Sequence, residues 1–315
     1  MNLGYRILRN LAIVIGVALP MPAAVTYSYD AAGRLITVTY STGSTISYAY
    51  DKAGNILSRS AQGSSAPLIN SVTVANGGAD IAQNTWIVIK GANLVPANTP
   101  ASGVDWSNAP DFAQGKLPTQ LGAVSVTVNA KPAFVYFYCS VVTSTVCASD
   151  QINVLTPLDN TLGPVQIVVA NGSTASPPFQ ANMKAIAPAF LLFNVAGYTA
   201  ATHADGSLLG PTSLYPGLST PAAPNETIVV YGVGFGLPTT AIVNGSLTQS
   251  GPLPANPACQ IGGNNAAVSF AGLTSPGLYQ VNLTVPATAN NGDNALSCTY
   301  NGSTTPPGAL ITVQQ

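Results

Sequence analysis

Hydrophobic and polar residues alternate along most of this chain in short runs, a period of two that predicts β-strands. Val124, Val126 and Val128 fall on one face of such a strand, with polar residues between them. The run from Trp86 to Ile89 is continuously apolar, as in a strand that is buried on both faces. Glycine and proline interrupt nearly every segment that could otherwise form a helix, so the pattern predicts an all-β chain.

The chain also repeats itself. Gln151-Ile-Asn153 recurs as Gln280-Val-Asn282, and Asn171-Gly-Ser-Thr174 recurs as Asn301-Gly-Ser-Thr304 at nearly the same separation. Repeats of this length predict tandem domains rather than a solenoid of short units. A length of 315 residues also favours about two domains.

The second copy shows the same alternation as the first. Its predicted strands are 227–233, 266–270, 279–285, 296–300 and 309–313. Short strands with regularly placed turns predict two tandem immunoglobulin-like β-sandwiches. We place the first sandwich at residues 68–187 and the second at 188–315.

Residues 25–60 form a third region with a repeat of its own. Tyr-Asp-x-x-Gly occurs from Tyr29 to Gly33 and again from Tyr50 to Gly54, and a short aliphatic strand follows each copy. Asp and Gly at these positions favour a tight turn, because Asp can bond its own downstream backbone and Gly can adopt a positive φ. The motif resembles the YD (Rhs) repeat, a family whose many copies build large β-shells around toxins or in cell-surface proteins. The resemblance implies secretion and a β-hairpin segment, and two copies are too few to enclose anything.

The two larger copies carry a second resemblance. The motifs are Ile89-Lys-Gly-Ala-Asn-Leu94, Leu117-Pro-Thr-Gln-Leu-Gly122, Asp150-Gln-Ile-Asn153 and Tyr231-Gly-Val-Gly-Phe-Gly236. As a set they resemble the IPT/TIG branch of immunoglobulin-like domains, and also an uncharacterised bacterial secreted C-terminal β-domain family. This resemblance implies a non-catalytic extracellular module and supplies no functional residue.

The N-terminus predicts export from a bacterial cell. Arg6 and Arg9 precede an apolar run from Leu11 to Leu19, and small residues follow as far as Ala24, which is typical of a signal peptide over residues 1–24. Nine apolar residues are too few to cross a hydrocarbon layer of ~30 Å, so we expect no transmembrane span in the mature chain. A Gly/Ser-containing linker at 61–67 would join the hairpin segment to the first sandwich.

Composition narrows the partners. Charged residues make up 6% of the chain, against roughly 25% in an ordinary soluble domain. Nucleic-acid binding is therefore not expected, because phosphate contacts require clustered basic side chains. We expect no cofactor and a partner that is a protein or a glycan at the cell surface.

The four cysteines predict two disulfides in an exported protein. Cys139 and Cys147 flank what looks like a hairpin loop, and Cys259 and Cys298 each lie at a predicted strand of the second repeat. A metal or redox site is the alternative, but the chain has no Cys-x-x-Cys and its only histidine is far from any cysteine in the sequence.

Few residues could carry catalysis or bind a metal. His203 is the only histidine and Glu226 the only glutamate, and no Gly-x-Ser-x-Gly elbow accompanies them. Calcium could be bound near Asp105 and Asp111, or at 290–294, which the sequence favours as a hairpin loop. We predict neither catalytic nor metal-binding residues.

The aromatic run at 134–138 is the most informative candidate for binding. Phe134, Tyr136 and Tyr138 would share one face of a strand, and the residues between them would share the other. Both faces are therefore apolar, although only one of them can point into a sandwich core. With Trp106 they could form an exposed ligand-facing strip. The other interpretation is that core covers one face and the neighbouring domain covers the other.

Together these patterns predict a non-catalytic secreted or cell-surface β-sandwich protein that acts in adhesion, binding or structural spacing. A carbohydrate-binding module that uses exposed aromatics is the first alternative, and a secreted hydrolase is the second.

Overall fold

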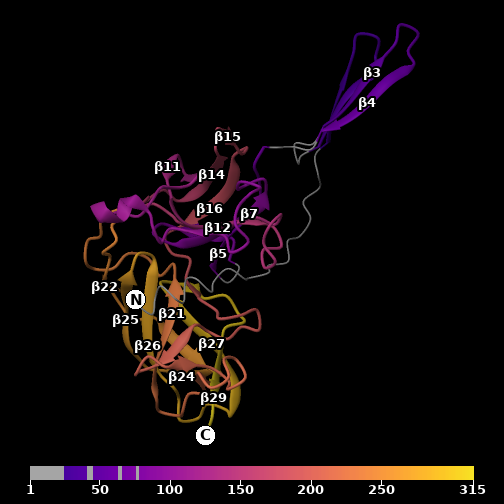
Figure 1. Cartoon of the computed structure of the whole chain (residues 1–315). Helices are drawn as coiled ribbons and strands as arrows, with labels where there is room; N and C mark the ends of the chain where they lie inside the picture. The colour runs from indigo at the N-terminus through magenta and orange to yellow at the C-terminus, as the bar shows by residue number, and fades with distance from the viewer. Residues whose placement is uncertain (1–24, 41–44, 63–65, 76–77) are drawn as a thin grey trace.

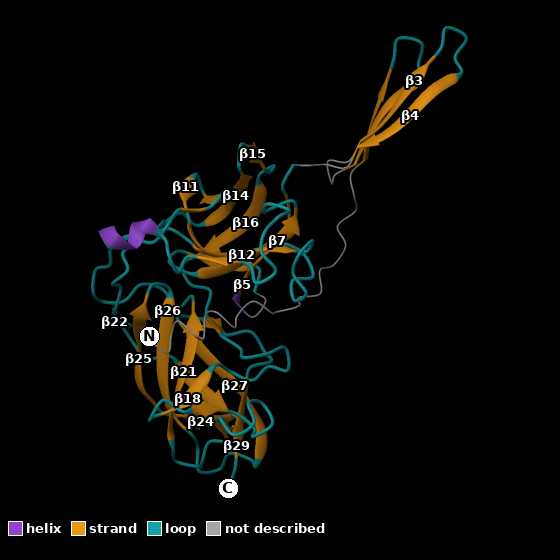
Figure 2. Cartoon of the chain, viewed as in Figure 1, coloured by secondary structure: helices purple, strands orange, loops and turns teal. Residues whose placement is uncertain are grey.

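A computed structural model describes residues 25–40, 45–62, 66–75 and 78–315 (Figure 1). Within those ranges the regular structure is β-strand, apart from 3₁₀-helical residues, among them Pro110–Gln114, and there is no α-helix (Figure 2). The all-β prediction is therefore confirmed. The predicted signal peptide at 1–24 lies outside the described residues.

The Tyr-Asp repeats form a four-stranded antiparallel sheet. Its strands pair in chain order: β1 (Val25–Tyr29), β2 (Leu35–Tyr40), β3 (Thr45–Tyr50) and β4 (Ile56–Gln62). The carboxylate of Asp30 accepts the backbone N–H groups of Ala32 and Arg34 at 2.9 Å each, and Gly33 has a φ of 76°. Asp51 and Gly54 repeat these features between β3 and β4, so the predicted turn chemistry is confirmed.

The first sandwich has two sheets, which Figure 1 shows stacked one over the other. One sheet contains β5 (Leu68–Val74), β7 (Trp86–Ala92), β13 (Asp150–Leu155), β12 (Phe134–Cys139) and β8 (Val104–Asp105), in that order. The other contains β11 (Lys131–Pro132), β10 (Val124–Val128), β14 (Gly163–Asn171), β16 (Phe179–Lys184) and β6 (Asp80–Ala82), with β9 (Gln120–Leu121) on β10 and β15 (Thr174–Ala175) on β14.

The alternation expected from the sequence places the core of this sandwich. Val124, Val126 and Val128 are buried on β10, and Ile152 and Val154 are buried on β13 in the facing sheet. At about 1.5–3 kcal/mol for each fully buried aliphatic side chain, this packing is the main stabilising contribution.

The second sandwich is built in the same way. Its larger sheet contains β20 (Ser219–Thr220), β19 (Leu208–Leu209), β18 (Ala201–His203), β21 (Thr227–Val233), β26 (Leu278–Thr284), β25 (Val268–Ser275) and β22 (Gly251–Pro252), with β17 (Ala189–Phe190) on β21. The smaller sheet contains β24 (Asn264–Ala266), β23 (Ala258–Ile261), β27 (Gly292–Tyr300) and β28 (Ser303–Thr304), with β29 (Leu310–Val313) on β27.

Side-chain hydrogen bonds show that the two sandwiches are copies. The Gln151 amide donates to the Asn153 side chain at 2.9 Å, and Gln280 donates to Asn282 at 2.9 Å on the equivalent strand. The hairpins at 171–174 and 301–304 are followed by matching bonds, since Ser176 Oγ accepts from Val169 N and Thr305 Oγ1 accepts from Cys298 N. The sequence repeat therefore corresponds to a structural repeat.

Two local predictions in the second sandwich are wrong. The single strand expected at 266–270 is divided between β24 and β25, with Ala267 between them. The hairpin loop expected at 290–294 is a connection between sheets, because Gly292 already begins β27 and that strand does not pair with β26 in this part of the structure. Polarity marked the turn correctly but did not show which strand would follow it.

Candidate functional site

A seam between the two sandwiches holds several of the aromatic residues that the sequence singled out. Trp86 Nε1 donates to the carbonyl of Pro276 at 2.9 Å, which joins β7 to the turn before β26. Leu117 N donates to the Gly245 carbonyl at 2.8 Å, and Leu247 N donates to the Gly115 carbonyl at 3.0 Å. A loop of the second sandwich thus pairs with the chain after the 3₁₀-helix as a short backbone ladder.

The four predicted ligand-facing aromatics are buried, and Phe134, Trp106 and Tyr136 lie near this seam. Trp106, Phe134, Tyr136 and Tyr138 are 4%, 6%, 5% and 4% exposed. Trp106 and Tyr136 meet edge to face with ring centroids 4.9 Å apart, and Trp86 contacts both at 5.6 Å. Edge-to-face pairs of this kind each add about 0.5–1.5 kcal/mol beyond their buried area.

The exposed strip expected from these residues is therefore not present, and that prediction is corrected. Two causes are visible. The register of β12 against β13 shifts between Val135 and Phe137, so a bulge breaks the strict alternation of faces. The second sandwich then covers what the first leaves open, since a Cβ added to Gly245 would overlap the Phe134 ring. Buried rings cannot stack on a ligand from solvent.

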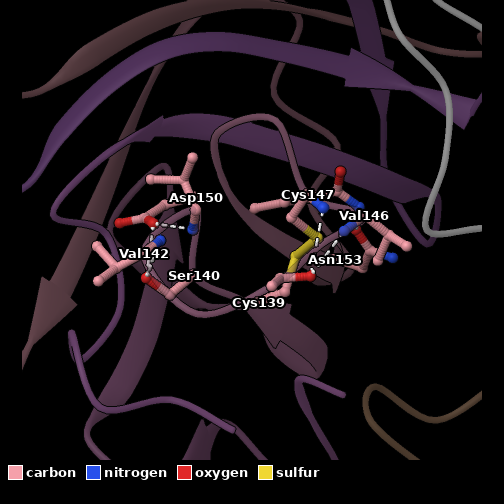
Figure 3. The surroundings of a disulfide bond; sticks show 10 residues. Cys139, Ser140, Val142, Val146, Cys147, Asp150 and Asn153 are labelled. Carbon is pink, nitrogen blue, oxygen red and sulfur yellow. Dashed lines mark hydrogen bonds between the residues drawn. A yellow bond between two sulfur atoms is a disulfide. The ribbon is translucent and has the colours of Figure 1, made fainter. Parts of the chain in front are cut away.

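The cysteines pair as predicted, Cys139 with Cys147 and Cys259 with Cys298. Cys259 and Cys298 are opposite each other on β23 and β27, inside the second core. The Cys139–Cys147 bond closes the hairpin loop between β12 and β13 at the surface (Figure 3).

A buried carboxylate fixes the start of the disulfide loop. Asp150 is 3% exposed, and its oxygens accept from Val141 N at 2.9 Å, Ser140 Oγ at 3.2 Å and Leu94 N at 3.0 Å (Figure 3). Further along, Ser144 N donates to the Ser140 carbonyl at 3.0 Å. The loop is therefore ordered before any partner arrives, which lowers the entropy cost of binding.

This rigid loop displays apolar side chains to solvent. Val141, Val142 and Val146 are 47%, 71% and 55% exposed. The interleaved residues are serine and threonine, and no charged residue lies between Cys139 and Cys147. An uncharged, disulfide-closed loop with exposed valines suits contact with an apolar surface of a partner.

The only histidine and the only glutamate of the chain meet in the second sandwich. His203 Nδ1 contacts Glu226 Oε1, and His203 Nε2 lies 3.0 Å from Thr220 Oγ1. This order resembles a hydroxyl–imidazole–carboxylate triad. However, Nε2 also lies 3.1 Å from the Thr220 carbonyl, which can only accept a hydrogen bond. An N–H that donates to this carbonyl leaves no lone pair to activate the hydroxyl.

The arrangement around His203 therefore works as a clasp. It joins β18 to β20 and to the turn before β21, and Glu226 Oε2 also accepts from Ala223 N at 2.8 Å. The hydrogen bonds of His203 and Glu226 therefore have a structural role, which is to hold these strands and the turn together.

Asp159 is a buried acid whose pKa is strongly perturbed. Burial alone would raise the pKa of its carboxyl, but hydrogen bonds from Asn129, Thr161 and Lys131 outweigh burial and hold the pKa well below its usual range. Lys131 Nζ lies 3.1 Å from the carboxylate, whose side chain is 1% exposed. Asn129, Thr161 and Lys131 hold the carboxylate in place, so the group stabilises a loop.

No cluster of three or more His, Cys, Asp or Glu side chains that could hold a metal ion occurs in the described part of the chain. Asp105, a calcium candidate from the sequence, accepts hydrogen bonds from Ser107 N and Oγ and caps its own turn. The described part of the chain also contains no helix that is long and apolar enough to cross a bilayer.

Comparison with known proteins gives a family match at the N-terminus. The RHS Repeat model matches residues 24–45 and 29–65, which confirms the resemblance of the Tyr-Asp motifs. No relative among curated proteins matches the chain.

Three solved structures with a similar chain course are distant from this chain. SGBP-B of the Bacteroides ovatus mixed-linkage glucan utilization locus, solved with a mixed-linkage heptasaccharide, is 12% identical, with 93% of this chain and 60% of that chain covered and a TM-score of 0.32. SGBP-B from a Bacteroides uniformis xyloglucan utilization locus is 16% identical, with 78% and 49% covered and a TM-score of 0.21. The Yersinia pseudotuberculosis adhesin InvE is 8% identical, with 78% and 59% covered and a TM-score of 0.20.

Likenesses at these scores carry no argument about function. The chain also spans only 60% and 49% of the two Bacteroides proteins. The immunoglobulin-like architecture rests on the two-sheet topology of each sandwich.

One of the two interpretations of the aromatic strand, that core covers one face and the neighbouring domain the other, agrees with the seam, but the sequence did not identify the residues that form it. The clasp was missed. The seam depends on Gly245 and Gly277, whose positive φ values of 69° and 68° bring backbone against aromatic rings. Both glycines lie in Gly-containing turns that resemble many others in the chain. One feature of the sequence could have indicated the clasp. The chain has few charged residues, so its single His and single Glu are stabilised by pairing with each other.

Proposed function

We propose that this chain is a non-catalytic secreted or cell-surface β-sandwich protein, which holds its two sandwiches in a fixed relation and binds a partner through a surface loop. Its sandwiches belong with the IPT/TIG-like modules that the sequence motifs resemble, divided near residue 187. The predicted signal peptide at 1–24 takes it out of the cytoplasm. Two disulfides support export, because they persist in oxidising compartments.

The observation that carries this proposal is the seam. Inter-domain contacts within a chain are ordinarily polar and mobile. In this chain Trp86, Leu155 and Phe134 pack against turns of the second sandwich, and backbone hydrogen bonds flank them. A hydrophobic junction of this kind suits a spacer that must keep its ends at a constant distance.

The disulfide loop supports the binding part of the proposal. Its valines are exposed on a backbone that Asp150 and the Cys139–Cys147 bond hold in place. The partner is a protein or a glycan at the cell surface, and the apolar side chains favour a protein. The aromatic residues that a carbohydrate-binding module would use are buried. We therefore do not propose a carbohydrate-binding module.

The test combines two assays on the purified chain. Small-angle scattering should give one distance between the two sandwiches, and this distance should not change between about 10 and 40 °C. A panel of ester, peptide and glycoside substrates should show no turnover above buffer. Turnover that disappears in His203→Ala would overturn the non-catalytic proposal, and a broad, temperature-dependent distance distribution would overturn the spacer.

A further inference from the structure

The N-terminal sheet has one apolar face. Register across β1 and β2 sets Val25 opposite Tyr40 and Tyr27 opposite Val38. Register across β2 and β3 sets Val38 opposite Ile46. Opposite residues in a sheet point to the same side, so a single face carries these residues together with others of their kind. The members are Val25, Tyr27, Tyr29, Val38, Tyr40, Ile46, Tyr48 and Tyr50.

The other face of the same sheet is hydroxylated. Thr26 is opposite Thr39, Ser28 is opposite Thr37, and Thr37 is in turn opposite Ser47. The pairing continues to the last strand, where Ser47 is opposite Ser60. Small polar side chains of this kind need no cover in water, so only the tyrosine face requires a partner.

Nothing in the described ranges covers the tyrosine face at its edge. Tyr27 and Tyr29 are 58% and 59% exposed, and Tyr40 is 37% exposed. Val38 alone is buried, beneath its cross-strand neighbours. Figure 1 shows this sheet as a single layer that stands away from both sandwiches. Large exposed side chains gathered on one face of a sheet mark a surface that meets a partner.

Two arginines extend this face. The Arg34 guanidinium lies 4.8 Å from the centroid of the Tyr50 ring, and its Nε donates to Asp30 at 2.7 Å. The Arg34 charge is thus paired with Asp30 and lies on the Tyr50 ring. This contact joins the first repeat to the second. Arg59 is opposite Tyr48 on the same face, where a second aromatic face could meet its guanidinium.

We propose that the tyrosine face is a self-association surface, which a second copy of this chain covers face to face. The pair would form a small β-sandwich in which two tyrosine faces interdigitate about 10 Å apart. Each sandwich further along the chain buries its apolar sheet faces by this packing. The N-terminal sheet has the same need and a single layer with which to meet it.

The size of the face sets the expected strength. Four strands about 4.8 Å apart and about six residues long give a face of roughly 19 by 20 Å. Two such faces would remove on the order of 800 Å² from water, which is below the ~1,200–2,000 Å² of stable complexes and within the range of weak, reversible ones. The dimer should therefore be weak and reversible, and we take a dissociation constant on the order of 100 µM as the working value for the test.

Sedimentation of residues 1–315 and of the chain without residues 1–24, from about 1 to 500 µM, tests this proposal. Both chains should pass from monomer to dimer over that range. The variant Tyr27→Thr/Tyr29→Thr keeps good strand-forming residues and should weaken association at least about tenfold. The control Thr26→Ser/Ser28→Thr changes the hydroxylated face of the same strand and should associate like the parent chain.

A charge-swap pair separates a lost interface from a damaged sheet. Tyr27→Glu and Tyr27→Lys should each remain monomeric alone, since each places like charges on both halves of the dimer. An equimolar mixture should dimerise again, because opposite charges then meet.

Three results would overturn the proposal. The first is a chain without residues 1–24 that stays monomeric at 500 µM, on the order of five times the expected dissociation constant. The second is association that the tyrosine variant leaves unchanged, which would place the contact elsewhere. The third is association that appears only after residues 1–24 are removed, which would make that apolar segment the natural cover. None of these outcomes depends on the proposed function of the sandwiches.

Discussion

Asp159 is a carboxylate whose ionised form the fold stabilises. Its lowered pKa means that it stabilises the folded state above the carboxyl pKa of the unfolded chain, near 4, and that this contribution is lost as pH falls through the folded value. We expect Asp159→Asn to lower the free energy of unfolding by about 2 kcal/mol at pH 7, because Lys131 then loses its ionic partner. Denaturant titrations at several pH values should show the two proteins converging in acid, and a constant difference would contradict the assignment.

The clasp around His203 makes a different prediction at the same scale. His203→Gln cannot reach Glu226 and Thr220 with the same rigid geometry, so we expect a loss of about 1–2 kcal/mol of stability. Asp205→Asn serves as the comparison and should cost less, because the Asp205 carboxylate accepts its hydrogen bonds from Ser207 within the same turn. Thermal unfolding of both variants measures this, and equal melting temperatures would contradict the clasp.

Residue-level prediction from the sequence succeeded where the reason was local. The Asp-x-x-Gly turns need only a short acceptor and a residue that tolerates positive φ, and both appear as expected at Asp30 and Gly33. It could not decide between exposure and burial for Tyr136 and its neighbours, because that is determined by a bulge and by chain more than a hundred positions away. Period-two patterns contain no information about either.

At the scale of elements, the disulfide loop can be tested by removing its covalent closure. Cys139→Ser/Cys147→Ser should lower stability by about 2.5 kcal/mol, the loop-entropy value for so short a bridge. The loop should nevertheless keep its position, because Asp150 still accepts from Val141 N and Ser140 Oγ. Hydrogen exchange at Val141 and Val142 measures this directly. Exchange of both amides at the unprotected rate would show that the disulfide alone orders the loop.

Strands were predicted well in the middle and poorly at their ends. The pattern at 227–233 and β21 agree, because alternating burial extends over the whole strand. The pattern at 266–270 did not show the break at Ala267, because both halves have similar polarity and only their partners differ. Which strand pairs with which is set by the sheet, and a single segment does not contain that information.

At the scale of the whole molecule, the turns of the second sandwich at Gly245 and Gly277 hold the seam together. Gly277 has a φ of 68°, and a Cβ at this position would overlap Leu155 and lie 2.9 Å from the Trp86 ring. Gly263 has a φ of 79° and open space around it. Alanine at either position meets similar backbone strain of about 1 kcal/mol, so the difference between the two variants isolates the contact between the sandwiches.

The chain reports on this contact by itself, since its two tryptophans, Trp86 and Trp106, both belong to the buried aromatic group at the seam. Gly277→Ala should separate the turn from Trp86, shift tryptophan emission to longer wavelength and lower the melting temperature by several degrees more than Gly263→Ala does. If the seam is what makes the sandwiches unfold together, calorimetry of Gly277→Ala should also resolve two transitions where the parent shows one. Equal emission spectra and equal melting temperatures for the two variants would mean that the sandwiches do not support each other, and the spacer proposal would fail with the seam.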